Sequence, residues 1–182
     1  IDTDSPTIKE LVPKHFKNET DRIIIYDRPE HLHGGHVATN DLFVNVIQEL
    51  NLDADYYFQT HTTNPLLKTS TINNAIEQFL NKKKEGYESL FSVKTHHTRF
   101  YNSNGEDMNH NRFKLIPTQD LDPIYEENSC IYIFTKESLF TFKARIAKKA
   151  FLFKMSDIES TDIDWPDDFE LAQILHQFYT EL

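Results

Sequence analysis

Asp55-Tyr-Tyr-Phe-Gln-Thr60 opens the stretch of sequence that decides the fold, and Ser89-Leu-Phe-Ser-Val93 closes it. Both are short apolar runs of the kind found in buried strands. Between them, residues 69–84 carry apolar side chains at helical spacing, and a run of lysines followed by Gly86 is typical of the C-terminal end of a helix. The stretch therefore predicts a strand, a helix and a second strand, which is the repeating unit of a parallel sheet.

The same alternation extends through most of the 182 residues. Further strands are predicted at 23–26, 130–134 and 150–154, and further helices begin near residues 6, 39, 136 and 166, the last running to residue 182. We therefore expect a single α/β domain over residues 1–182, built as three layers with helices on both faces of a mainly parallel sheet. In such sheets ligands bind beyond the carboxyl ends of the strands.

The alternation breaks at residues 96–117, which are polar. Asn102-Ser-Asn-Gly105 is a turn sequence, and it lies between two short extended runs at 99–101 and 112–116. This segment is predicted to be a hairpin insertion.

Composition excludes several classes of function. The formal net charge of −10 argues against nucleic-acid binding, which needs a basic face. No run of 18 apolar residues is present, so a membrane span is not expected. The single cysteine, Cys130, rules out an internal disulfide and fits the reducing cytoplasm, where a small buried thiol acts as an apolar side chain.

An acidic element near the end of the sequence carries the clearest chemical signal. It reads Glu159-Ser-Thr-Asp-Ile-Asp-Trp-Pro-Asp-Asp168. In an extended segment Asp162 and Asp164 point to the same face. Two such carboxylates are suited to Mg²⁺, which often binds one or two carboxylates together with substrate phosphates. The alternative is a solvated acidic turn followed by an acidic first turn of a helix.

A second candidate metal site is weaker. His31, His33 and His36 lie in one loop, but their spacing is irregular and no cysteine lies nearby. A solvated histidine-rich loop is the preferred interpretation over a zinc site.

Five segments, in order along the chain, resemble the acylneuraminate cytidylyltransferases, the family that includes the CMP-sialic acid synthetases. They are Ile1-Asp-Thr-Asp-Ser-Pro-Thr-Ile8; Arg28-Pro-Glu-His-Leu32 with Val37-Ala-Thr-Asn40; His61-Thr-Thr-Asn-Pro-Leu66; Thr118-Gln-Asp-Leu-Asp-Pro-Ile-Tyr-Glu-Glu-Asn128 with Ile131-Tyr-Ile133; and the acidic element. The resemblance implies a fold like that of the nucleotide-diphospho-sugar transferases. It also implies that CTP is coupled to an acidic nine-carbon sugar of the sialic, legionaminic or pseudaminic acid type, giving a CMP-sugar and pyrophosphate.

The resemblance also assigns residues. It implies that Asp162 and Asp164 are catalytic and hold Mg²⁺. The residues implied for nucleotide binding are Arg28, Ala38 and Asn40, and those implied for the sugar are His61, Thr63, Asn64, Gln119, Asn128 and Tyr132. Without the resemblance, Arg28, Gln119 and Asn128 read as polar loop or turn residues and Tyr132 as a core aromatic. The hairpin insertion lies where the family has its dimerisation arm, which implies a homodimer.

The sequence departs from the family pattern in several places. His61, Asn64 and Ser129 replace the usual glutamine, serine and glycine. The family's Gly/Lys/Arg-rich phosphate loop has no counterpart here, and the chain opens without methionine in what reads as the end of a strand. We therefore expect that residues upstream of Ile1 have been removed or are not represented in this sequence. The alternatives to the enzyme above are a nucleotidyltransferase for a different sugar and a truncated or degenerate binding module without activity.

Overall fold

The computed structural model describes residues 1–179, and its centre is a sheet of four strands in the order β3-β5-β4-β6. The strands are β3 (Tyr57–Thr60), β4 (Ser89–His96), β5 (Ile124–Phe134) and β6 (Ala150–Lys154). β4 and β6 are parallel, whereas β5 is antiparallel to both β3 and β4. Three of the four strands therefore run in one direction, and the expected α/β class is confirmed.

The direction of β5 has a simple cause. After β4 the chain runs out into a long arm and returns beside β4 as β5. Two neighbouring strands joined in this way are antiparallel. A second, two-stranded parallel sheet pairs β1 (Asp2–Thr3) with β2 (Tyr26–Asp27). Of the strand predicted at 23–26, only the last residue, Tyr26, belongs to β2.

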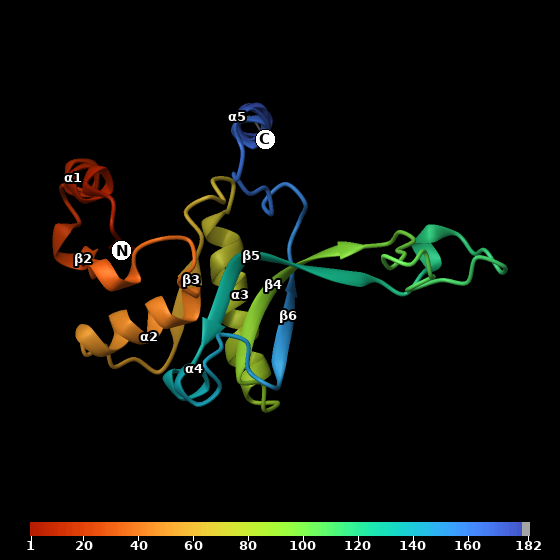
Figure 1. Ribbon diagram of the computed structural model, residues 1–182, viewed down its shortest axis with the longest axis horizontal. Helices are drawn as coiled ribbons and strands as arrows, with labels where there is room; N and C mark the ends of the chain where they lie inside the picture. Colours follow the sequence, from red (N-terminus) through yellow and green to blue (C-terminus); the bar gives the residue numbers. More distant parts are fainter. Residues whose placement is uncertain (180–182) are drawn as a thin grey trace.

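Helices cover both faces of the central sheet, as expected (Figure 1). On one face, α3 (Thr69–Lys83) buries Ala75 and Phe79 against Leu90 of β4 and Ile133 of β5. On the other face, α2 (Thr39–Glu49) and α4 (Lys136–Phe142) pack Ile47 and Leu139 against side chains of β5. Alternate residues of β5 supply both cores, because successive side chains of a strand point to opposite faces.

The remaining elements lie around this body. They are α1 (Pro6–His15), α5 (Pro166–Tyr179) and the short 3₁₀ turns η1 (Thr20–Arg22), η2 (Glu30–Leu32) and η3 (Thr118–Asp120). Ser5 caps α1 as its sequence suggests, since its hydroxyl accepts from the N–H of Ile8. The prediction that the last helix reaches residue 182 extends beyond the described residues. The sequence from residue 136 to 145 also predicts a helix over that whole range, but the helix ends at Phe142, because Lys143 takes a left-handed backbone with φ of 50°.

The predicted insertion is an arm that projects far from the body (Figure 1). Its paired part is formed by β4 and β5, with Thr95 opposite Tyr125 and His96 opposite Ile124. The turn at 102–105 is present, but the runs at 99–101 and 112–116 do not form the expected strands, and a single bridge joins Tyr101 to Asp107.

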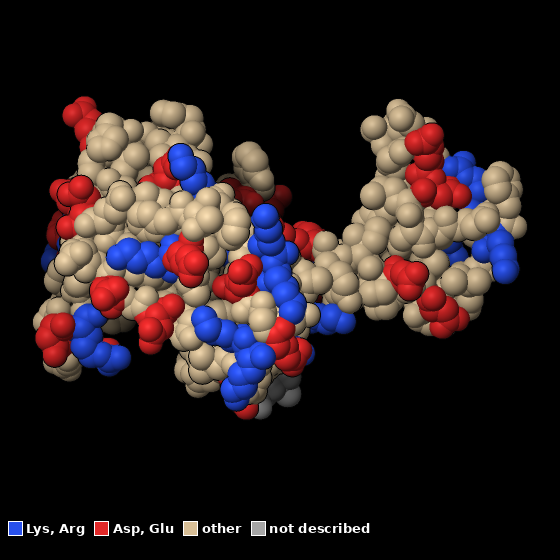
Figure 2. Space-filling view, turned by 90° about the horizontal axis from the view of Figure 1, so that it is seen from below, with Lys and Arg blue, Asp and Glu red and all other residues tan. Residues whose placement is uncertain are grey.

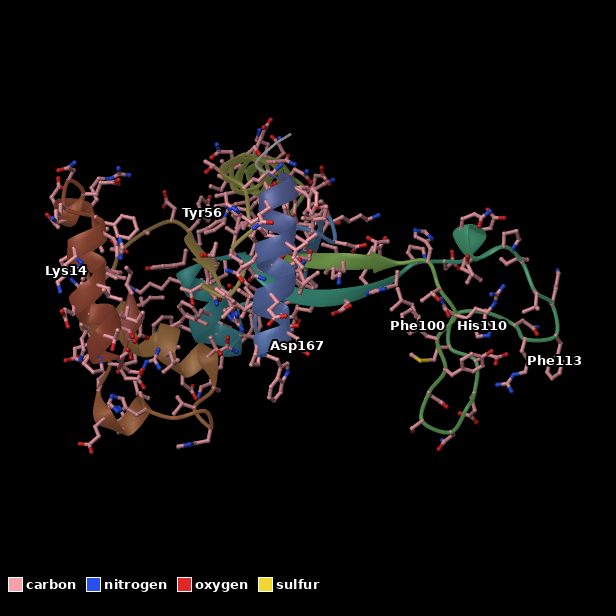
Figure 3. The ribbon with its side chains drawn as sticks, turned by 90° about the horizontal axis from the view of Figure 1, so that it is seen from above. Lys14, Tyr56, Phe100, His110, Phe113 and Asp167 are labelled. Carbon is pink, nitrogen blue, oxygen red and sulfur yellow. The ribbon has the colours of Figure 1, made fainter. Side chains whose placement is uncertain are left out.

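Side chains replace the missing strand ladder at the arm tip. The side chain of Asn102 accepts from the N–H groups of residues 104 and 106, Asn109 accepts from Phe100 N–H, and Asp107 accepts from Arg112 N–H. Figure 3 shows Phe100 and His110 within this tip and Phe113 at its far end.

Both signs of charge are spread over the body and the arm tip on the face shown in Figure 2. No helix within residues 1–179 is long and apolar enough to cross a membrane.

Candidate functional site

A polar cavity of about 640 Å³ lies beyond the ends of β4 and β6, and we call it the acidic pocket. It is lined by Lys94 of β4, by residues 126–129 of β5, by residues of the loop after β6 and by Asp168, Leu171 and Leu175 of α5. Asp162, Asp164 and Asn128 all line it. The structure therefore gathers the acidic element and one of the predicted sugar-side residues at the sheet edge where α/β proteins bind ligands.

Three hydrogen bonds hold the loop that carries the aspartates. The N–H of Ile163 donates to the carbonyl oxygen of Thr63 at 3.0 Å, and the side-chain amide of Asn64 donates to the carbonyl oxygen of Thr161 at 3.2 Å. The N–H of Lys68 donates to the buried carboxylate of Glu159 at 3.1 Å. Residues 61–68, which we call the supporting loop, therefore hold the acidic element in place. Thr63 and Asn64 belong to this support and do not line the acidic pocket.

Asn128 fastens the same loop to the sheet. Its side-chain oxygen accepts from Ser92 Oγ at 2.5 Å and from Cys130 N–H at 3.3 Å, and its amide nitrogen donates to Ser160 Oγ at 2.8 Å. The side chain is buried. Because these bonds fix the amide, its pocket-facing surface is held in one orientation.

Ser129 explains why a glycine is usual after this asparagine. Its φ is 57°, in the left-handed region that favours glycine, and it lies beside an irregularity in the pairing of β4 with β5. The departure from the family pattern therefore keeps the backbone shape at a cost in strain.

The two aspartates assigned to Mg²⁺ by the family resemblance both line the acidic pocket. Asp162 Oδ1 accepts from the N–H of Ile163, which fixes that carboxylate, whereas Asp164 is exposed and its carboxylate makes no hydrogen bond in the part of the chain described. Carboxylate oxygens are the ligands Mg²⁺ prefers, and two of them leave room for water and phosphate. Residues 1–179 contain no cluster of three or more His, Cys, Asp or Glu side chains suited to a metal.

Asp168 has a different role. For this residue the alternative interpretation, an acidic first turn of a helix, is right. Its Oδ2 accepts from the N–H groups of Asp164 and Trp165, at 3.1 and 2.8 Å, just before α5. The acidic start of α5 is therefore a helix cap. In the histidine-rich loop, His33 bonds through Nε2 to the carbonyl oxygen of Arg28 at 2.8 Å.

The residues assigned to the nucleotide lie apart from the acidic pocket. Arg28 forms an ion pair with Asp2 at 2.9 Å between the two short strands. Ala38 precedes α2, and its carbonyl oxygen already accepts from Asp41 N–H. Asn40 bonds through its amide to the carbonyl oxygen of Lys143. None of the three lines the acidic pocket.

A residue that the sequence did not single out joins the two regions. Arg145 donates through Nε to Asn40 Oδ1 at 2.9 Å and through Nη1 to Gln59 Oε1, and its guanidinium lies 4.0 Å above the ring of Tyr132. Burial lowers the pKa of Arg145. The sequence predicts Arg145 as the last residue of a helix, where a surface cation is common, so it carries no signal for this role.

Tyr132 lies behind the wall of the acidic pocket. Its hydroxyl donates to the carboxylate of Glu127 and contacts Ser129 Oγ, and both of these residues line the pocket. Burial, followed by the bond to Glu127, raises the pKa of Tyr132 to about 12. The tyrosine is thus a core residue that positions the pocket wall.

The last two sugar-side assignments are not brought to the pocket. Gln119 is exposed in η3, in the outer part of the arm beyond the paired strands, and His61 begins the supporting loop (Figure 1). Neither lines the acidic pocket.

Cys130 is buried, as predicted for an unreactive thiol. Its Sγ lies 3.5 Å from the carbonyl oxygen of Glu159, and burial raises its pKa to about 12.

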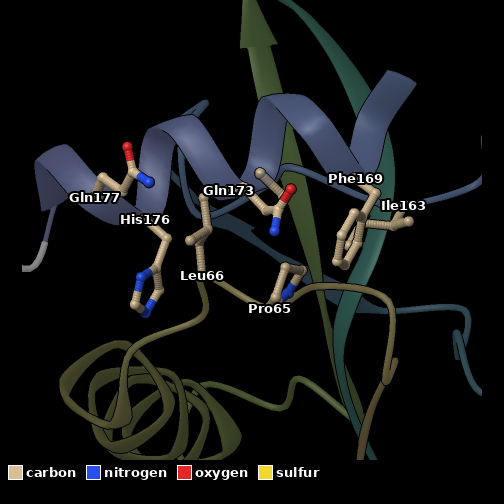
Figure 4. Close-up of a pocket in the computed structure, with 8 residues that line it drawn as sticks. Pro65, Leu66, Ile163, Phe169, Gln173, His176 and Gln177 are labelled. Carbon is tan, nitrogen blue, oxygen red and sulfur yellow. The ribbon is translucent and has the colours of Figure 1, made fainter. Parts of the chain in front are cut away.

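An apolar pocket of about 290 Å³ separates α5 from the supporting loop (Figure 4). Pro65 and Leu66 face Phe169, Gln173 and His176 across it. Its lining is almost entirely hydrocarbon, so we assign the chemistry to the acidic pocket.

Solved structures share this architecture. A 4-diphosphocytidyl-2C-methyl-D-erythritol synthase superposes with a TM-score of 0.58 at 13% identity, covering 95% of this chain and 79% of that one. A second synthase of the same name, from Anaerococcus prevotii, gives 0.57 at 9% identity, covering 94% of this chain and 78% of that one. At these identities the likeness concerns the fold alone.

The sequence itself matches the cytidylyltransferase family over residues 1–180, and the chain belongs to that family. An N-acylneuraminate cytidylyltransferase of Streptococcus agalactiae serotype V is 24% identical over 159 residues, and the protein of the same name from serotype III is 24% identical over 165 residues. Each match covers 86% of this chain and 38% of the relative. The chain therefore spans well under half of the length of these relatives. The family resemblance found in the sequence is confirmed.

Proposed function

We propose that this chain is the catalytic domain of a nucleotidyltransferase that couples CTP to an acidic nine-carbon sugar of the sialic, legionaminic or pseudaminic acid type. Family membership supports the use of CTP, and the relatives named N-acylneuraminate cytidylyltransferase support an acidic sugar. The observation that carries the proposal is the acidic pocket, which places Asp162, Asp164 and Asn128 around one cavity at the ends of the strands.

In the proposed reaction a hydroxyl oxygen of the sugar attacks the α-phosphorus of CTP. The bond from that phosphorus to the bridging oxygen breaks, pyrophosphate leaves, and the hydroxyl proton is released. Such a transfer depends mostly on positioning and on stabilising charge that builds on phosphate oxygens. A Mg²⁺ ion held by Asp162 and Asp164 would supply that stabilisation.

The residues of this chain then have separate tasks. Glu159, Asn64 and Asn128 hold the acidic loop in place through the hydrogen bonds described above. Tyr132 and Arg145 order the wall between the pocket and α2. We assign the cytosine to the region of Arg28, Ala38 and Asn40, and a homodimer to the projecting arm. A cytoplasmic location stays a prediction.

The test is a pyrophosphate-release assay with the complete protein, CTP, Mg²⁺ and a panel of acidic sugars. Release that requires both the sugar and the metal is expected, with CTP preferred over ATP. Release with only neutral sugars would assign a different acceptor. No release with any sugar, together with retained binding of CTP, would identify a binding module and overturn the proposal.

A further inference from the structure

The acidic pocket has an uneven distribution of charge. Its wall carries six carboxylates, Glu126, Glu127, Asp157, Asp162, Asp164 and Asp168, and a single cation, Lys94. An anionic substrate entering this cavity meets repulsion from most of the wall. A metal ion held by Asp162 and Asp164 would offset only part of that repulsion.

Within residues 1–179, the ammonium of Lys94 forms no ion pair with a carboxylate. It lies opposite Glu126 in the pairing of β4 with β5, where opposite charges commonly pair. However, the carboxylate of Glu126 accepts from His96 Nε2 at 2.6 Å, and none of the ion pairs or hydrogen bonds of residues 1–179 involves the ammonium of Lys94. The side chain is half-buried on the pocket wall. Its three N–H donors are therefore available to a ligand.

The position of Lys94 favours the sugar over the nucleotide as the source of the anion. Lys94 shares the pocket with Asn128 and Ser129, whereas Arg28, Ala38 and Asn40 lie elsewhere. A cavity of about 640 Å³ is also of the size that encloses a small ligand. The expected acceptors carry one carboxylate each, and an ammonium is a natural partner for it.

We propose that Lys94 binds the carboxylate of the acidic sugar and makes the pocket selective for acidic over neutral sugars. This inference rests on the proposed function. Lys94 acts by contact with the substrate, so its replacement changes sugar binding and leaves CTP binding as it is.

The experiment compares N-acetylneuraminate with its methyl ester, which lacks the charge, in the wild-type protein and in Lys94→Met. The wild-type KM for the acid is expected to be about 10- to 100-fold below that for the ester. Lys94→Met should raise the KM for the acid by the same factor, remove the preference, and leave the KM for CTP unchanged. Lys94→Arg keeps the charge and should retain most of the preference.

Lys154→Met is the matched control. Lys154 pairs with Val93, the residue before Lys94, so it points to the opposite face, where its ammonium lies 5.1 Å from the ring of Tyr125. The Lys154→Met substitution should leave the KM for the acid and the KM for CTP unchanged. If Lys94→Met lowers the melting temperature, Lys94→Gln replaces it in the same comparison.

The outcomes separate the two claims. An unchanged preference in Lys94→Met, or a rise in the KM for CTP alone, would overturn the role of Lys94. In that case turnover of acidic sugars by the wild type would still support the proposed function. A wild type that turns over neither the acid nor any other acidic sugar would overturn the proposed function and this inference with it.

Discussion

Ser129 shows how one residue reports on backbone strain beside the acidic pocket. A non-glycine residue in the left-handed region costs about 1 kcal/mol or more, and Ser129 has φ of 57°. Replacing it with glycine should stabilise the protein by up to about 1 kcal/mol, since Tyr132 keeps its bond to Glu127. Ser129→Ala keeps the Cβ atom and loses only the hydroxyl. Urea unfolding of both variants should place the glycine variant above wild type and the alanine variant at or below it.

Asp164 and Asp168 lie four residues apart, and the structure predicts opposite effects for them. Asp164→Ala removes an exposed carboxylate without a hydrogen bond, so metal-dependent pyrophosphate release should be lost while the melting temperature is unchanged. Asp168→Ala removes the acceptor for two N–H groups at the start of α5 and should cost about 1 kcal/mol of stability. Full activity in Asp164→Ala would rule out the metal role.

Cys130 should behave as a protected thiol. Its pKa is raised to about 12 by burial, so at pH 8 the native protein should react with a thiol reagent only after unfolding. Because the folded pKa is raised, the thiol contributes stability that is fully present below the unfolded value of about 9 and is lost as pH rises toward 12. Rapid labelling of native protein, against an unfolded reference, would show that the loop after β6 opens readily.

At the scale of the elements, Arg145 connects parts that are distant in sequence. It bonds to Asn40 at the start of α2 and to the buried Gln59 of β3, and it lies on the ring of Tyr132 in β5. Arg145→Lys keeps the charge but cannot reproduce the planar fork. Both Arg145→Ala and Arg145→Lys should therefore lose stability, by about 1–3 kcal/mol in thermal or urea unfolding, whereas Arg22→Ala on the exposed η1 turn should not. A fully stable Arg145→Lys would show that charge alone matters.

Elements with continuous apolar runs could be predicted from the sequence. The strand at 150–154 has the predicted ends, and β4 begins at the predicted Ser89. β5 was predicted only from Cys130, because its first half is polar; that half forms the arm and the pocket wall, where no core demands apolar residues. The arm tip was mistaken for paired strands because asparagine and aspartate side chains satisfy its backbone instead.

The candidate site divides in the same way. Spacing alone suggested Asp162 and Asp164, because neighbouring carboxylates are a local pattern. The contacts of Asn128 with Ser92 and Ser160, and the positions of Arg145 and Lys94, depend on segments that meet only in the fold. No local pattern contains that information, since each of these residues looks like an ordinary polar residue in its own segment.

At the scale of the whole molecule, the arm leaves apolar side chains in solvent. Phe113 is 92% exposed, Leu115 67% and Met108 60%, on a tip held well away from the body. Large exposed apolar surfaces mark protein–protein contacts, and these side chains are candidates for one. His110 is buried within the tip against the edge of Tyr101, so the tip is a packed knob rather than a loose loop.

If the arm forms the proposed homodimer, charges placed on this knob should break it. Phe113→Asp with Leu115→Asp is expected to shift the protein from dimer to monomer in sedimentation velocity, with an unchanged melting profile of the isolated monomer, because neither side chain supports the body. The control is Phe178→Asp on α5, whose side chain is also largely exposed, at 67%. A dimer that survives the arm substitutions but dissociates with Phe178→Asp would place the interface on α5. A wild type that sediments as a monomer at all concentrations would overturn the proposed homodimer.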